Sequence, residues 1–167
     1  MNWFKFEQAI RLLVKFYPEQ DQKKPSLFHS IRVWSYLYNN WYSEEIQIAG
    51  LLHDALEDTI ISEDTIKKFF WENILKIVIA NSKSDNIKKE EVLENIILKC
   101  VEYGENALIV KMIDVYDNFI FYINEQFFSE IDRCKYLAEL IIKHKPQSWN
   151  DKSFKLVNEI LKYKIEK

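Results

Sequence analysis

The segment LLHDALEDT, residues 51–59, places an adjacent histidine and aspartate directly after an apolar run, with an acidic pair behind them. If the helix expected from about residue 43 continues to Asp58, then Glu57 stacks beside His53 and Asp58 beside Asp54, because residues four apart share a helix face. The three carboxylates would then repel one another and lose hydration beside an apolar surface unless a cation joined them. The segment therefore predicts a metal-type cluster near the end of a helix.

A second polar cluster lies in the most apolar stretch of the chain, residues 106–125. Lys111, Asp114 and Asn118 are spaced by three and four residues, so they share one face of the expected helix. A carboxylate buried in such a helix requires an opposite charge, a metal ion or several hydrogen-bond donors. Asp114 is accordingly either a metal ligand or the ion-pair partner of Lys111 or of an arginine such as Arg32.

The remaining part of the pattern is His29, in an expected helix over about residues 26–41 that Ser26 can cap. A single histidine of this kind is more often a hydrogen-bonded core or surface residue than a ligand. The chain has three histidines, and two of them belong to this pattern. The metal prediction therefore rests on the combination, in chain order, of His29, the His53–Asp54 pair and Asp114.

The scarcity of chain breakers favours an all-helical fold. Glycine occurs only at positions 50 and 104, and proline only at positions 18, 25 and 146, whereas an all-β fold needs many Gly/Pro turns. Apolar residues recur at helical spacing. The expected helices cover about residues 3–16, 26–41, 43–58, 62 onward, 88–103, 106–125, 129–144 and 149–165, with 72–80 helical or strand-like and a loop at 81–86.

The composition predicts one soluble domain over residues 1–167. The chain is 48% apolar and 29% charged, with a formal charge of −3 and lysines mixed among acids, so no nucleic-acid-binding face is indicated. The two cysteines, Cys100 and Cys134, lack metal-type spacing and are expected to be reduced core thiols. No signal peptide or membrane-spanning run is apparent, and we expect a cytoplasmic protein without a membrane partner.

The motifs together resemble those of the HD superfamily of metal-dependent phosphohydrolases, whose pattern is H…HD…D. Within that superfamily they are most similar to the hydrolase domain of the RelA/SpoT alarmone family and its small single-domain relatives. That domain carries an HDxxED segment, matched here from His53 to Asp58, and a KxxDxxxN segment, matched here from Lys111 to Asn118. The likeness spans roughly residues 5–145.

The resemblance implies an all-α, single-domain HD-type bundle of about seven to nine helices that holds one divalent metal. The mixed nitrogen and oxygen ligands suit Mn²⁺, Fe²⁺ or Zn²⁺, and the family points to Mn²⁺. Glu57 and Asp58 are expected to orient a water molecule and move its proton, with Glu57 the preferred acceptor. The remaining expected site residues comprise the metal ligands His29, His53, Asp54 and Asp114, the phosphate-binding Lys23, Lys24 and Lys111, and Asn118 at the sugar or base.

The resemblance further implies a phosphorylated nucleotide as the substrate, with guanosine tetraphosphate losing pyrophosphate from its 3′ position. The loop at residues 20–25 lacks the Arg and Gly that the family usually shows, and Ser30 follows His29 where the family has Pro. These departures leave open a phosphomonoesterase that acts on a nucleoside monophosphate or another small phosphate ester. A third alternative is a non-catalytic nucleotide-binding or interaction module. The presence of every motif residue argues against this last alternative.

Overall fold

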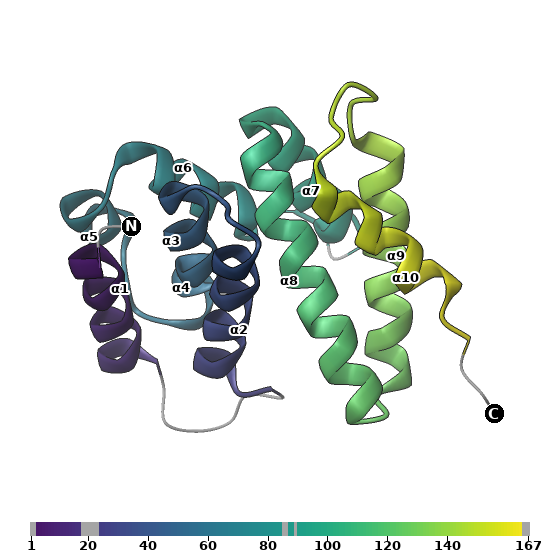
Figure 1. The fold of residues 1–167 in the computed structure, drawn as a ribbon, viewed down its shortest axis with the longest axis horizontal. Coiled ribbons are helices and arrows are strands. Elements are labelled where there is room, and N and C mark those ends of the chain that lie inside the picture. Colours follow the sequence, from purple (N-terminus) through teal and green to yellow (C-terminus); the bar gives the residue numbers. More distant parts are fainter. Residues whose placement is uncertain (1–2, 18–23, 85–86, 89, 165–167) are drawn as a thin grey trace.

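The structure is a computed structural model that describes residues 3–17, 24–84, 87–88 and 90–164. Within these residues every regular element is a helix, which confirms the expected all-α class (Figure 1). The helices, in chain order, are α1 (Trp3–Phe16), α2 (Ser26–Asn39), α3 (Glu44–Leu52), α4 (Ala55–Asp58), α5 (Glu63–Phe69), α6 (Glu72–Asn81), α7 (Val92–Tyr103), α8 (Glu105–Asn124), α9 (Phe128–His144), the 3-10 helix η1 (Lys152–Lys155) and α10 (Leu156–Lys162).

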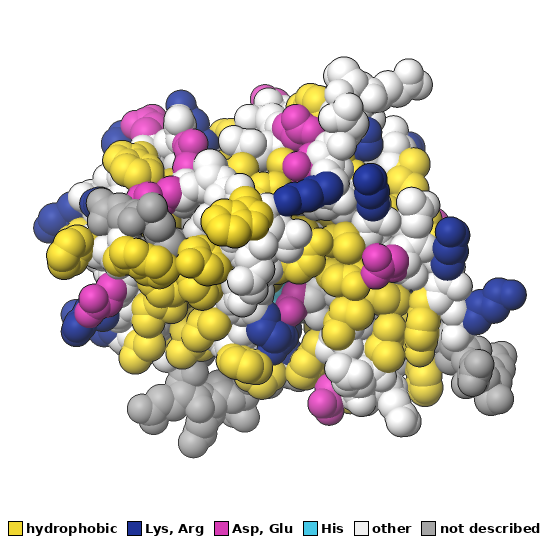
Figure 2. Space-filling model, viewed as in Figure 1, with side chains coloured by type: hydrophobic (Ala, Val, Ile, Leu, Met, Phe, Trp, Pro, Cys, Tyr) yellow, Lys and Arg dark blue, Asp and Glu magenta, His cyan; other side chains and the backbone are white. Residues whose placement is uncertain are grey.

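Helix α8 is the centre of the fold. It packs against α2 and α3 on one side and against α7, α9 and α10 on the other (Figure 1). Residues 107–115 of α8 are all buried, as expected for a helix that is apolar almost all round. On the face shown in Figure 2, basic and acidic side chains are interspersed with apolar ones. No helix among the described residues is both long enough and apolar enough to cross a membrane.

Serine side chains cap two of the helices, whereas the cap expected at Ser26 is absent. The side chains of Ser43 and Ser62 accept hydrogen bonds from the backbone of the first turns of α3 and α5. Ser26, in contrast, is the first residue of α2, which has Pro25 at its N-cap and no side-chain cap. The predicted cap was therefore wrong, and the Ser26 hydroxyl instead lies close enough to Asp58 to lower the pKa of that carboxyl.

The predicted continuous helix over residues 43–58 was also wrong. The structure divides it into α3 and α4 by a turn at His53 and Asp54. The Nδ1 atom of His53 donates to the carbonyl of Gly50 at 2.8 Å, the group that the Asp54 N–H would bond in an uninterrupted helix. The division brings the total to ten α-helices in the described part of the chain.

Gly50 allows α3 to lie very close to α2. A Cβ atom built at this position would meet Cδ1 of Leu37 at 2.2 Å. We expect Gly50→Ala to destabilise the protein by about 1–3 kcal/mol through overpacking, as measured by urea unfolding. The double variant Gly50→Ala/Leu37→Val should recover part of that loss, since it removes the clashing methyl group. Equal stability of Gly50→Ala and the wild type would show that this contact between α2 and α3 is not tight.

Candidate metal centre

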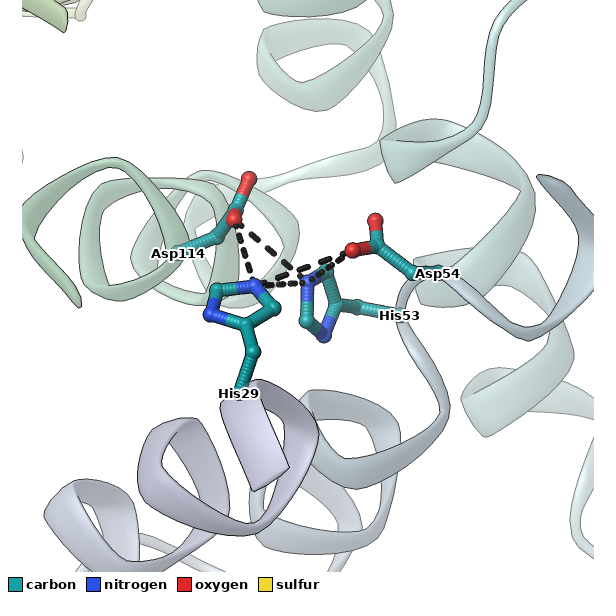
Figure 3. Close-up of side chains that lie close together, drawn as sticks. All are labelled: His29, His53, Asp54 and Asp114. Carbon is teal, nitrogen blue, oxygen red and sulfur yellow. Dashed lines mark hydrogen bonds and ion pairs between the residues drawn. The ribbon is translucent and has the colours of Figure 1, made fainter. Parts of the chain in front are cut away.

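Four side chains from three parts of the fold meet in the protein interior. His29 comes from the first turn of α2, His53 and Asp54 from the turn between α3 and α4, and Asp114 from the middle of α8 (Figure 3). One ligand-type atom from each residue lies within 4.8 Å of the others, and both histidines are fully buried. The structure thus brings together all four residues that the sequence suggested as metal ligands.

The turn between α3 and α4 explains how two adjacent residues face the same point. Neighbouring side chains diverge on a regular helix, but Asp54 lies outside helical geometry as the N-cap of α4, with φ −96° and ψ 1°. The Oδ2 atom of Asp54 consequently lies 3.1 Å from Nε2 of His53 and 3.7 Å from Nε2 of His29.

The hydrogen bonds of the two imidazoles direct one nitrogen of each toward the centre. The Nδ1 atom of His53 donates to a backbone carbonyl, and Nδ1 of His29 lies 2.6 Å from the carboxylate of Asp117. With both Nδ1 atoms as donors, the two Nε2 atoms carry lone pairs, yet they lie 3.2 Å apart. Two lone pairs and two carboxylate oxygens that converge in this way require a shared proton or a cation.

The spacing of these atoms fits a bound divalent ion. Atoms that ligate one ion at roughly 2.1 Å lie about 3 Å apart when they are neighbours in its coordination shell. The observed separations include 3.1 Å from His29 Nε2 to Asp114 Oδ1 and 3.5 Å from His53 Nε2 to the same oxygen. The donor set and its geometry therefore suit a divalent metal, and the cluster could hold one.

Asp114 is both a member of the cluster and the ion-pair partner of Lys111. Its Oδ2 atom accepts from the buried Lys111 ammonium at 2.9 Å, and its Oδ1 atom accepts from Asn118 at 2.7 Å. Burial raises the pKa of Asp114, but Lys111 and the two histidines lower it further, well below its usual value. Asp114 is therefore ionised, as a metal ligand must be.

Without a cation, protonation of His53 offsets the negative charge of the two carboxylates in the cluster. Burial lowers the pKa of His53, but Asp54 and Asp114 raise it more, to about 10. Burial also raises the pKa of Asp54, whereas contact with His53 lowers it overall. Metal binding and protonation of His53 therefore compete for the same lone pair.

The acidic pair behind the cluster has two different environments. Glu57 faces away toward the end of α6, where its carboxylate accepts from the Lys83 backbone N–H at 2.6 Å and pairs with the Lys83 ammonium at 2.5 Å. Asp58 instead bonds Ser26, and its pKa is raised by burial and by the nearby charge of Asp54. Both acids lie in the single turn of α4, so the expected stacking of Glu57 on His53 in one helix does not occur.

Three of the four basic and amide residues expected at the substrate, Lys24, Lys111 and Asn118, border the cluster. Lys24 Nζ lies 2.8 Å from Asn118 Oδ1 and 3.7 Å from Asp54 Oδ2, so it flanks the cluster. Lys111 is 7% exposed and is engaged by Asp114. Lys23 lies outside the described residues.

The sequence-based reasoning missed two residues beside the cluster, Asp117 and Tyr17. Asp117 accepts hydrogen bonds from Nδ1 of His29 and from Arg32. Burial raises the pKa of Asp117, but these two contacts lower it overall. Tyr17 bonds Ser30 and lies close enough to Asp54 and Asp58 for their charges to add to the effect of burial in raising its pKa. The three-residue spacing from Asp114 to Asp117 was the available signal for Asp117, because it places both acids toward one side of α8.

The fold and the cluster define a class of protein: an all-helical domain whose interior gathers two histidines and two aspartates in the order H…HD…D. The family model described as HD domain matches residues 9–102, and the chain belongs to this family. That range contains three of the four cluster residues, while Asp114 lies beyond it.

Two curated relatives carry the name guanosine-3′,5′-bis(diphosphate) 3′-pyrophosphohydrolase. The relative from Aquifex aeolicus is 33% identical over 118 residues, which cover 67% of this chain and 17% of the relative. The relative from Borreliella burgdorferi is 27% identical over 106 residues, which cover 59% of this chain and 16% of the relative. The chain therefore spans only a small part of the length of the curated relatives it matches.

Two solved structures share the fold. A metazoan orthologue of SpoT, described as hydrolysing ppGpp, superposes with a TM-score of 0.73 at 20% identity and covers 93% of each chain. A crystal structure of a protein from Listeria monocytogenes EGD-e superposes with a TM-score of 0.64 at 25% identity and covers 81% of this chain and 99% of the other.

Proposed function

We propose that this chain is a metal-dependent phosphohydrolase that releases pyrophosphate from the 3′ position of guanosine tetraphosphate. The observation that carries the proposal is the buried cluster of two imidazoles and two carboxylates with a lysine, an amide and an acidic pair at its edge. The names of the curated relatives support this substrate.

His29, His53, Asp54 and Asp114 are the proposed ligands of the divalent ion. Their mixed nitrogen and oxygen atoms suit Mn²⁺, Fe²⁺ or Zn²⁺, and we propose Mn²⁺ because the resemblance to the RelA/SpoT hydrolase domain points to it. When bound, such an ion polarises a phosphoryl oxygen and lowers the pKa of a water molecule. Lys111 holds Asp114 ionised and in place through their 2.9 Å contact.

The residues around the ion have distinct proposed roles. Asp58 accepts the proton of the attacking water, because it lies beside Asp54 and burial raises its pKa, whereas the Glu57 carboxylate pairs with the Lys83 ammonium at 2.5 Å. We therefore propose Asp58, rather than Glu57, as the preferred acceptor, and Glu57 as the residue that orients the loop after α6 through Lys83. Lys24 offsets phosphate charge, and Asn118 bonds the sugar or base.

The test is a metal-dependence and substrate screen of the full chain. We expect protein stripped with EDTA to be inactive, and Mn²⁺ to restore the conversion of guanosine tetraphosphate and water to GDP and pyrophosphate, followed by chromatography and pyrophosphate detection. Nucleoside monophosphates and a simple phosphate ester provide the comparison. Hydrolysis confined to the monoesters would favour the phosphomonoesterase alternative. Bound metal without turnover of any phosphate ester would favour a binding module.

A further inference from the structure

The two histidines of the cluster are held by different partners on their outer nitrogens. His53 donates from Nδ1 to the neutral carbonyl of Gly50 at 2.8 Å. His29 donates from Nδ1 to the carboxylate of Asp117 at the shorter distance of 2.6 Å. A carboxylate that accepts the outer proton of an imidazole makes the inner nitrogen more basic than a carbonyl does. The cluster is therefore asymmetric in the donor strength of its two imidazoles.

Arg32 fixes the position of the Asp117 carboxylate. Its Nε and a terminal nitrogen donate to the two oxygens of Asp117 at 2.8 and 2.7 Å, a bidentate geometry that Arg alone provides. The guanidinium also lies 5.0 Å from the ring centre of Phe28 and 5.8 Å from that of Phe121. Because His29, Phe28 and Arg32 belong to α2 and the other residues to α8, the arrangement also joins the two helices that carry His29 and Asp114.

We propose that Arg32 and Asp117 are positioning residues that hold His29 with its Nε2 lone pair toward the metal position and make it the stronger imidazole donor. This inference rests on the proposed function only in that the cluster holds a divalent ion. Loss of an outer partner of this kind typically weakens metal affinity about 10–100-fold.

The decisive variant is Asp117→Asn, which keeps the shape of the side chain and removes its charge. We expect this variant to bind Mn²⁺ about 10–100-fold more weakly than the wild type in a calorimetric titration of metal-free protein. The visible absorption of the Co²⁺-loaded protein should shift as well, because the donor strength of His29 changes. Neither measurement depends on hydrolysis.

Glu94→Gln is the matched control. Glu94 accepts from His144 at 2.7 Å and pairs with Lys143 at 2.7 Å, so it is a histidine-bonded carboxylate with a basic partner that lies outside the cluster. Its loss should leave both the Mn²⁺ affinity and the Co²⁺ spectrum unchanged.

Arg32→Lys and Arg32→Met provide a second test, because they leave in place the Asp117 oxygen that contacts Nδ1 of His29. Lysine keeps the charge and loses the bidentate fork, so the Mn²⁺ affinity should fall in the order wild type, Arg32→Lys, Arg32→Met, with thermal unfolding confirming that each variant is folded. Wild-type Mn²⁺ affinity and Co²⁺ spectra in Asp117→Asn and Arg32→Met would overturn the proposal. A wild-type chain that binds Mn²⁺ but leaves guanosine tetraphosphate intact would overturn the proposed function and not this inference.

Discussion

Asp54→Asn is expected to abolish both metal uptake and hydrolysis. Asp54 contributes one of the two carboxylates of the cluster, and an amide in its place supplies neither the charge nor a strong ligand. Loss of a residue that only hydrogen-bonds a metal ligand weakens metal affinity by up to roughly 100-fold. Loss of a direct ligand should weaken Mn²⁺ binding by more than that. The hydrolysis rate should fall to that of metal-free protein. Metal analysis of the purified variant and a pyrophosphate-release assay measure the two effects.

The effect on His53 distinguishes loss of a ligand from loss of the fold. Burial lowers the pKa of His53, and Asp54 is the largest of the charges that raise it to about 10 in metal-free protein. In Asp54→Asn that pKa should drop, which an NMR titration of the imidazole detects. The exposed Asp64 offers a control, since Asp64→Asn removes the same charge on α5 without touching the cluster. A variant at Asp54 that retains metal and turnover would remove this residue from the proposed site.

Asp58→Asn is expected to keep the metal and to lose turnover. Loss of general-base assistance typically lowers a rate about 10²–10⁴-fold, because the proton of the water no longer has an acceptor in the transition state. The metal content should remain near the wild-type value, since Asp58 is not among the four clustered residues. The measured quantities are kcat for guanosine tetraphosphate and bound Mn²⁺ per chain.

Glu57→Gln gives the paired comparison for this assignment. Its carboxylate is engaged by Lys83, so its loss should reduce kcat less than the loss of Asp58. Lys83→Met should reproduce the effect of Glu57→Gln if Glu57 acts through that contact. The reverse ranking, with Glu57→Gln inactive and Asp58→Asn near wild type, would transfer the proton-acceptor role to Glu57.

The differences between sequence expectation and structure have local causes. The first helix was predicted over residues 3–16 and is observed over Trp3–Phe16. This prediction succeeded because apolar spacing and the following Pro18 are local features of the sequence. The turn at His53 and Asp54 could not be predicted in this way, since every residue around it accepts a helical conformation. It is associated with a side-chain bond from His53 to the Gly50 carbonyl.

The chemistry of the cluster and the all-α class followed from the sequence by itself. Residue type and periodic spacing determine which side chains can bind a metal and which segments form helices, and both are local properties. The motif pattern already predicted that His29 meets Asp114, 85 positions away, but tertiary structure alone decided that Asp117, 88 positions away, accepts the hydrogen bond from Nδ1 of His29. It also decided that Lys83 engages Glu57 and leaves Asp58 beside Asp54. Such contacts depend on how α2, α4, α6 and α8 pack, which the spacing within any single helix does not specify.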